Sequence, residues 1–454
     1  MKKNKVDIFD YTLFSKLMFY VKPYKNIYYF VMSAAILVSG FSVLTPYLLK
    51  IIVDDFIQLK DYDGMILIIT LMLITLIAEV IFQFFFVFFA NLLGQNVIKD
   101  LRLVLYKKII GFRMSYFDQS AVGRLVTRAV NDIETIASIF SQGLFMIIAD
   151  LLKMAVVIII MLVINWKLSL IVFSILPLII YATRLFQKSM KTAFEEVRLQ
   201  VANLNSFIQE QLTGMQIVQL FHREEIEFKK FTSINEKHKE AWLKTVWYNS
   251  IFFPVAEISS SITLGLLVWF GGLNVATGGS ISLGTIFLFI QMSQMLFRPL
   301  RQIADKFNTL QMGMVAAERI FKIIGTKSII NDLGSKTPKD IKGKISIKNL
   351  KFSYKHGEEV IRGINLTIRP GEKIAIVGST GAGKSTLINL LARFYEYDSG
   401  EIYIDNIKIR DFSLKSLRSH IGIVLQDVFL FADSILNNIT LNNLNISKEM
   451  VINV

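Results

Sequence analysis

Six long apolar segments constrain this 454-residue chain more than any other feature. A helix needs about 20 mostly apolar residues to span the hydrocarbon core of a bilayer, and a helix satisfies its own backbone hydrogen bonds there. The mean hydropathy of +0.49 agrees with a membrane protein. The qualifying segments are approximately 27–49, 64–93, 140–164, 167–186, 249–277 and 282–304. They predict an all-α, multi-pass membrane domain with six spans.

The placement of charge predicts how these segments are oriented. The N-terminal arm and the two long polar stretches, 94–139 and 187–246, are rich in Lys and Arg. The short connection at 50–63 instead holds four acidic residues, Asp54, Asp55, Asp61 and Asp63. Because Lys and Arg gather on the cytoplasmic side, we expect both termini and both long stretches to be cytoplasmic. The net charge of +14 then reflects contact with anionic lipid, and we expect no nucleic-acid partner.

Two residue types exclude further chemistry. The chain has no cysteine, so disulfides and thiolate metal sites are excluded. The four histidines lack metal-ligand spacing; they are His222, His238, His356 and His420.

Ahead of the first span, residues 7–22 could form a helix lying on the membrane surface, with a frayed tail as the alternative. Its apolar face would comprise Ile8, Tyr11, Leu13, Phe14, Leu17 and Met18.

A change of pattern near 325–343 predicts a linker between two domains. Gly, Pro and charged residues interrupt the helical pattern there. Beyond the linker the apolar period becomes two, as in half-buried strands, in "KISIKNLKFSY" and in "INLTI". We therefore expect a transmembrane domain over 1–324 and an incomplete α/β nucleotide-binding domain over 344–454.

The stretch "GSTGAGKST" matches the phosphate-loop pattern G-x-x-x-x-G-K-[ST]. An apolar strand is expected before it at 373–377, and a helix with one buried face after it. Glycines let backbone N–H groups point at phosphate oxygens, and the helix N-terminus adds a favourable dipole. Lys384 would reach the β- and γ-phosphates, and the Ser385 hydroxyl would ligate Mg²⁺. The predicted nucleotide-binding residues of the loop are Gly378, Ser379, Thr380, Gly381, Ala382, Gly383, Lys384, Ser385 and Thr386.

Two flanking residues could complete the nucleotide site. Tyr354 ends a predicted strand and could stack on an adenine ring, although an aromatic side chain at such a position is more often part of the core. Gln426 ends an apolar strand expected at 421–425 and could reach a metal-bound water or the γ-phosphate, although such a residue is more often an ordinary polar residue at a strand end.

The order of Tyr354, "GSTGAGKST" and "LRSHIGIVLQDVFLF" resembles the nucleotide-binding domain of ABC transporters. In that resemblance Tyr354 matches the adenine-stacking aromatic, the glycine loop matches Walker A and Gln426 matches the Q-loop. The stretch at 116–136 resembles the first intracellular loop of ABC exporters, with matching Phe117, Asp118, Gly123, Arg128 and Asp132, and 217–231 resembles the second. Six spans before one nucleotide-binding domain is the layout of multidrug and lipid half-transporters.

The resemblance implies a mechanism and its partners. Two such subunits, identical or different, would pair, and short coupling helices in the intracellular loops would press on the nucleotide domains. Phe117, Asp118, Phe221 and Glu224 are candidate contact residues, with packing inside their own helices as the alternative. ATP and Mg²⁺ are the implied cofactors, an amphipathic drug or lipid the implied substrate, and a bacterial plasma membrane the implied location.

Several parts of the family pattern do not occur in this sequence. There is no LSGGQ-like signature, no apolar strand ending in Asp-Glu after Gln426, and no switch histidine at the expected position. We therefore expect an incomplete record that binds ATP without hydrolysing it by the family mechanism. The alternatives are a natural non-hydrolysing regulator and an importer with the same membrane fold; a membrane-tethered kinase or GTPase fits least.

Ionisable residues within the predicted spans are the remaining candidates for function, because they are costly at membrane depth. Asp150 and Lys153 could pair on one helix face, which would stabilise packing. Glu257 could meet a cationic substrate. Glu79 has no predicted role, and Pro177 and Pro254 are expected to bend helices rather than to mark a site.

Overall fold

The computed structural model describes residues 10–453 except 331, 356 and 427, so the predictions made for Ile8 and His356 lie outside the described residues. The chain divides into two compact units. The helical unit comprises residues 1–110 and 123–326. The sheet unit comprises residues 111–122 and 327–454.

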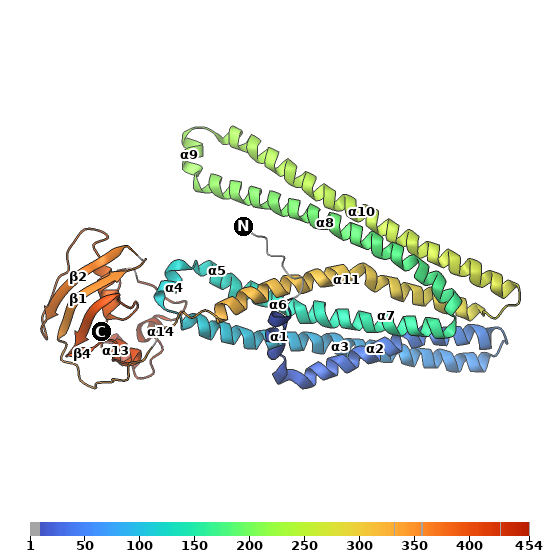
Figure 1. The fold of residues 1–454 in the computed structure, drawn as a ribbon, viewed down its shortest axis with the longest axis horizontal. Helices are drawn as coiled ribbons and strands as arrows, with labels where there is room; N and C mark the ends of the chain where they lie inside the picture. Colours follow the sequence, from blue (N-terminus) through green and yellow to red (C-terminus); the bar gives the residue numbers. More distant parts are fainter. Residues whose placement is uncertain (1–9, 331, 356, 427, 454) are drawn as a thin grey trace. The chain divides into compact units, whose positions relative to one another are not determined.

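The elements follow one another as an N-terminal run of helices and a C-terminal sheet with short helices (Figure 1). The helices that precede the sheet are α1 (Tyr11–Phe19), α2 (Lys25–Ile51), α3 (Tyr62–Ile110), α4 (Met114–Gln119), α5 (Val122–Thr127), α6 (Ile133–Ser138), α7 (Phe145–Ile164), α8 (Trp166–Thr213), α9 (Met215–Leu220), α10 (Glu224–Ala276) and α11 (Leu283–Ile324). The remaining elements are β1 (Ile345–Ser353), β2 (Glu359–Ile368), α12 (Lys384–Leu391), β3 (Ser399–Ile404), β4 (Ile407–Lys408), α13 (Leu414–Ser419), α14 (Ile435–Thr440) and α15 (Lys448–Ile452).

Each of the six apolar segments falls largely or wholly within helical structure. Among the described residues, five helical stretches are long and apolar enough to cross a membrane: Lys22–Ile57, Tyr62–Ile110, Val122–Ile164, Trp166–Thr213 and Glu224–Ala276. The sixth predicted span lies in α11, whose apolar sequence is interrupted by Gln291, Gln294 and Arg298; its crossing of the membrane stays a prediction. The chain is an integral membrane protein.

The three longest helices of the described chain are much longer than a membrane requires. α3, α8 and α10 contain 49, 48 and 53 residues, which at 1.5 Å per residue is about 70–80 Å, more than twice the thickness of the hydrocarbon core. α8 and α10 run side by side, joined through the short helix α9 (Figure 1). Because of this length, the helices carry polar extensions beyond the membrane. Pro177 and Pro254 lie inside α8 and α10.

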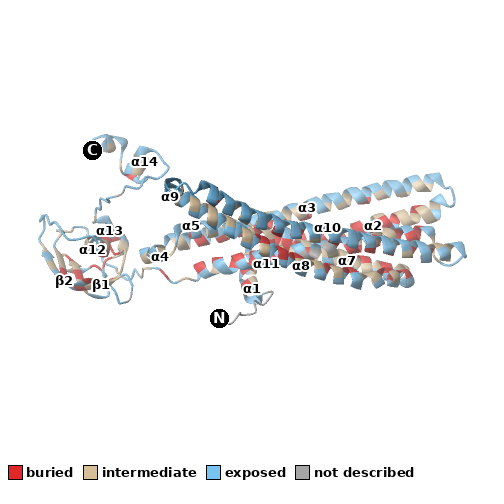
Figure 2. Ribbon diagram, turned by 90° about the horizontal axis from the view of Figure 1, so that it is seen from above, coloured by how far each residue is buried: buried red, intermediate tan, exposed pale blue. Residues whose placement is uncertain are grey.

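The core of the helical unit brings together residues from α2, α7, α8, α10 and α11, and buried positions gather along their inner faces (Figure 2). Its members are Val43, Val157, Met161, Leu168, Val172, Ile179, Leu267, Leu288, Phe289, Met292, Leu296 and Phe297. In the N-terminal helix α1, Leu13 and Leu17 are buried, and α1 packs on α11. A helix therefore forms within the predicted segment and packs against protein, while its position on the membrane surface stays a prediction.

Two polar contacts fix α11 to other helices. The carboxylate of Asp54, just after α2, accepts hydrogen bonds from the Gly284 backbone N–H (2.7 Å) and from the Ser282 hydroxyl. The hydroxyl of Ser282 in turn caps the first turn of α11. Further along α11, Lys306 forms an ion pair with Asp150. Asp150 thus pairs across helices, rather than with Lys153 on its own helix.

The sheet unit contains a four-stranded antiparallel sheet in the order β2-β1-β3-β4. In β1, Ile345 lies opposite Ile368 of β2 and Ile404 of β3. The sheet and α12 enclose an apolar core that includes Leu350, Phe352, Ile361, Leu387, Leu390 and Phe412. The alternating pattern therefore predicted β1 and β2 correctly.

The strands predicted at 373–377 and 421–425 are wrong for the described structure, where both segments are irregular. A strand forms only by hydrogen bonding to a neighbour, and the described sheet ends at β2 and β4 without either segment. Most of their apolar side chains are exposed: Val377 is 87 % and Val424 is 99 % accessible.

Two polar residues brace the sheet unit around α12 and the linker. Arg393 is buried, and its guanidinium donates to Glu396 Oε1 (3.0 Å) and to the carbonyl oxygens of Ile409 and Phe412 (3.3 Å each). Asp405 accepts from the backbone N–H groups of residues 342–344. Partial burial acts to raise the pKa of Asp405, but these backbone hydrogen bonds outweigh it and hold that pKa below its usual value.

Candidate nucleotide site and coupling helix

The glycine loop at 377–386 forms a tight turn that ends at the start of α12. Gly381 and Gly383 have φ values of +86° and +85°, a left-handed conformation that glycine adopts without steric cost. The Lys384 ammonium donates to the carbonyl oxygens of Gly378 (2.9 Å) and Ser379 (2.8 Å). The loop therefore curls around the ammonium group of Lys384, and its residues are largely exposed.

Helix α12 holds this loop against the sheet. Thr386, Leu387 and Leu390 are buried, and Leu387 and Leu390 belong to the same apolar core as Ile361 of β2. Ser385, between Lys384 and Thr386, remains exposed. Because the first turn of a helix has unpaired N–H groups and a positive dipole end, the loop and α12 together suit an anion such as a phosphate chain.

The structure brings Tyr354 to this loop. The Tyr354 hydroxyl donates to Thr386 Oγ1 at 3.1 Å, and the residue is 42 % exposed. Its ring packs edge-on against Phe352 (centroids 4.8 Å apart) and Tyr395 (5.1 Å apart, 88° between planes). Tyr354 is therefore anchored by its neighbours and still partly accessible to a planar ligand.

Gln426 is not brought into a comparable contact, because it lies exposed in the irregular segment after α13. Nor do the described residues contain a cluster of three or more His, Cys, Asp or Glu that could hold a metal ion. This donor set still fits a magnesium nucleotide, since Mg²⁺ usually takes few protein ligands and completes its shell with phosphate oxygens and water. Ser385 is exposed at the start of α12, and its role as a magnesium ligand stays a prediction.

Helix α4, from the first long polar loop, belongs to the sheet unit. At its start, Arg113 donates from its backbone N–H to the Ser328 carbonyl (2.8 Å) and from Nε to Ser328 Oγ (3.3 Å). Near its end, the Tyr395 hydroxyl donates to Asp118 Oδ2 at 2.7 Å. The predicted contact residue Asp118 therefore touches the same unit as the phosphate loop.

Tyr395 is a residue that the sequence reasoning missed. It lies shortly after the end of α12 in the chain, and its ring contacts Tyr354 while its hydroxyl binds Asp118. Burial and the hydrogen bond to Asp118 together raise the pKa of Tyr395 above its usual value, so the phenol stays protonated and acts as a donor. The available signal was its position beside the loop helix, which does not reveal a partner in α4.

The second long polar stretch turns at α9, within the helical unit. Phe221 follows α9 and is 66 % exposed, and Glu224 begins α10. Arg223 and Lys230 both bind the Glu227 carboxylate, at 2.9 and 3.0 Å, which fixes the start of α10. Contact of Phe221 or Glu224 with a nucleotide domain stays a prediction.

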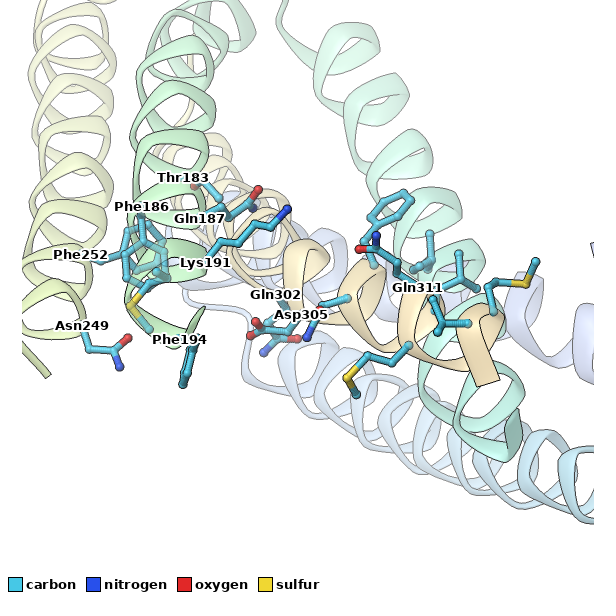
Figure 3. Close-up of a pocket in the computed structure, with 18 of the residues that line it drawn as sticks. Thr183, Phe186, Gln187, Lys191, Phe194, Asn249, Phe252, Gln302, Asp305 and Gln311 are labelled. Carbon is cyan, nitrogen blue, oxygen red and sulfur yellow. The ribbon is translucent and has the colours of Figure 1, made fainter. Parts of the chain in front are cut away.

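A cavity of about 1850 Å³ opens within the helical unit among α7, α8, α10 and α11. Figure 3 shows Thr183, Gln187 and Lys191 following one another along α8, and Phe186 lying against Phe252. Those two rings are stacked, with centroids 4.0 Å apart. Charged residues of both signs also line the cavity: Asp132, Lys191, Glu195, Arg198, Glu257, Arg298, Asp305 and Arg319. The lining is therefore amphipathic, and it includes the Glu257 singled out from the sequence.

Both units contain a region that matches a known protein family. A family model described as "ABC transporter transmembrane region" matches residues 28–300, and one described as "ABC transporter" matches residues 361–452. The "Uncharacterized ABC transporter ATP-binding protein YknV" of Bacillus subtilis is 30 % identical over 98 % of this chain and 74 % of its own length. An "ATP-dependent lipid A-core flippase" of Syntrophus aciditrophicus is 31 % identical over 97 % of the chain and 73 % of its own length.

A third relative is the "Probable multidrug resistance ABC transporter ATP-binding/permease protein YheH" of Bacillus subtilis, 28 % identical over 87 % of this chain and 58 % of its own length. The transmembrane match covers more than half of the chain, and the relatives align across both units. An ABC ATP-binding region follows the membrane helices in the same polypeptide. The chain therefore belongs to the ABC transporter family, as a half-transporter of the exporter type.

Proposed function

We propose that the transporter of which this chain forms part couples ATP binding and hydrolysis to the outward movement of an amphipathic drug or lipid across a bacterial plasma membrane. The observation that carries this proposal is the placement of the phosphate loop, Tyr354 and α4 within one compact unit. A site for nucleotide and a helix that leads into the membrane domain are thereby mechanically connected.

Within the proposed site each residue has one task. Tyr354 stacks on adenine, the backbone N–H groups of 378–384 bind phosphate oxygens, and Lys384 exchanges its two carbonyl partners for the β- and γ-phosphates. Ser385 and Gln426 would hold Mg²⁺, which when bound neutralises phosphate charge. Gln426 would need to approach the loop from its exposed segment.

The domain limits, orientation and assembly are parts of the same proposal. We assign the transmembrane domain to 1–324, the linker to 325–343 and the ATP-binding domain to 344–454, with both termini cytoplasmic. A second half-transporter subunit would complete the translocation path. A polypeptide of residues 1–454 alone would bind ATP without turning it over by the family mechanism, because no LSGGQ-like signature occurs in it.

The substrate class rests on the cavity and on the relatives' names. Stacked Phe186 and Phe252 offer an apolar surface next to polar Gln187 and Lys191, which suits a molecule with an apolar body and a polar head. One relative is named as a lipid A-core flippase and another as a probable multidrug resistance transporter. An amphipathic drug or lipid is consistent with both names.

Substitution of Lys384 tests the proposal. Lys384→Ala should abolish ATP-dependent transport of a fluorescent lipid or amphipathic dye in proteoliposomes containing the paired transporter, while membrane insertion is unchanged. Lys373→Ala, an exposed lysine just before the loop, is the matched control and should transport normally. Normal ATP-dependent transport by Lys384→Ala would contradict the assignment of the nucleotide site.

A further inference from the structure

We propose that Tyr395 is the positioning residue that links the adenine side of the nucleotide site to helix α4. The inference rests on the proposed nucleotide site and concerns how nucleotide binding there is transmitted to α4. Tyr395 makes contacts on both sides of this link: its ring meets Tyr354, and its hydroxyl binds Asp118. No other residue between them is needed, so a change at Tyr354 reaches α4 through one side chain.

The contact on the nucleotide side is geometrically specific. The rings of Tyr354 and Tyr395 are nearly perpendicular, at 88°, and Phe352 packs edge-on against both at 4.8 and 5.8 Å. Edge-to-face packing fixes the relative orientation of aromatic rings. A purine stacked on the exposed part of Tyr354 would restrain that ring, and the restraint would pass to Tyr395.

On the other side of the link, hydrogen bonds hold α4 at both of its ends. Arg113 ties the start of α4 to Ser328, and Asp118 ties its end to Tyr395. The chain passes from the sheet unit to the helical unit just beyond, at Gly123. A displacement of the Tyr395 hydroxyl therefore turns α4 about its Ser328 tie and moves the chain that leads into the membrane helices.

The hydrogen bond between Tyr395 and Asp118 is suited to hold under this displacement. It is short, at 2.7 Å, and its acceptor is a carboxylate, which makes it stronger than a bond between neutral groups. Burial and the Asp118 carboxylate raise the pKa of Tyr395, which keeps the donor proton in place at physiological pH. Because coupling between sites is reciprocal, the position of α4 should in turn alter the affinity for ATP.

The absence of cysteine from the sequence gives a direct test. Gln119→Cys places a thiol on the exposed last residue of α4, where an environment-sensitive fluorophore can report on the helix in the full chain. Binding of a fluorescent ATP analogue is measured separately. We expect saturating ATP to change the reporter signal, and Tyr395→Phe to reduce that change about fivefold or more while ATP still binds.

Two further variants make the result specific. Asp118→Ala should reduce the reporter change as much as Tyr395→Phe, and the double variant should lose no more than either single one, since both remove the same bond. Tyr403→Phe is the matched control, because the Tyr403 hydroxyl also binds a carboxylate, Glu401, in the sheet unit. Its reporter change should equal that of the unsubstituted chain.

The outcomes separate this inference from the site on which it rests. A full reporter change in Tyr395→Phe at saturating ATP, or an equal loss in Tyr403→Phe, would overturn the inference and leave the nucleotide site standing. Failure of the unsubstituted chain to bind the ATP analogue would overturn both. Loss of the reporter change with ATP binding retained, in Tyr395→Phe and Asp118→Ala but not in Tyr403→Phe, supports the link.

Discussion

Two glycines of the phosphate loop should respond very differently to the same substitution. Gly381 and Gly383 share a left-handed backbone, and an L residue there costs about 1–2 kcal/mol. A Cβ at Gly381 meets no atom within 4 Å, whereas a Cβ at Gly383 lies 2.8 Å from Ile361 Cδ1. Ile361 is 1 % exposed and packed in the core, so accommodating the methyl group costs about a further 1–3 kcal/mol.

We therefore expect Gly383→Ala to destabilise α12 by about 2–5 kcal/mol and Gly381→Ala by about 1–2 kcal/mol. Hydrogen-exchange mass spectrometry of the α12 amides, without nucleotide, measures this local opening. The difference of about 1–3 kcal/mol corresponds to exchange roughly 5- to 150-fold faster in Gly383→Ala than in Gly381→Ala. Equal rates in the two variants, or faster exchange in Gly381→Ala, would refute the close packing of α12 on β2.

Three other substitutions test contacts outside the loop. Arg393→Met should destabilise the sheet unit by about 2–5 kcal/mol, because two buried carbonyl oxygens lose their donor; pulse proteolysis in urea measures this, and an unchanged midpoint would contradict it. Asp405→Asn should lower the melting temperature at neutral pH. Since the pKa of Asp405 is depressed on folding, its contribution is complete at a pH well above the unfolded-state pKa of about 3.9 and is lost as the pH falls through the folded-state pKa, so the difference between variant and parent should shrink in acid. Asp54→Ala should weaken the first turn of α11 by about 0.5–2 kcal/mol, seen as faster amide exchange there; unchanged exchange would contradict the capping role.

The features that the sequence predicted correctly are those with local causes. Apolar length alone places the long helices, because a bilayer requires that length. Alternation over a few residues predicts β1 and β2. The glycine loop was recognisable because its turn and the helix that follows are encoded in one short stretch ending at Thr386.

The features that the sequence did not predict depend on partners far away in the chain. The apolar segments at 373–377 and 421–425 look like strands, but strand formation depends on neighbours that the local pattern does not specify. Asp150 has a possible partner three residues away, yet it pairs with Lys306 of another helix. The hydrogen bond between Tyr395 and Asp118 joins residues 277 positions apart, a contact to which no periodicity points.

Photolabelling with 8-azido-ATP tests the central claim most directly, namely that the glycine loop and Tyr354 form one ATP site. The account predicts that ultraviolet light attaches the label to the tryptic peptide of residues 352–355, which contains Tyr354. Excess ATP and the Lys384→Ala substitution should each prevent labelling. A label attached elsewhere in the chain, or labelling of residues 352–355 that persists in Lys384→Ala, would contradict the account.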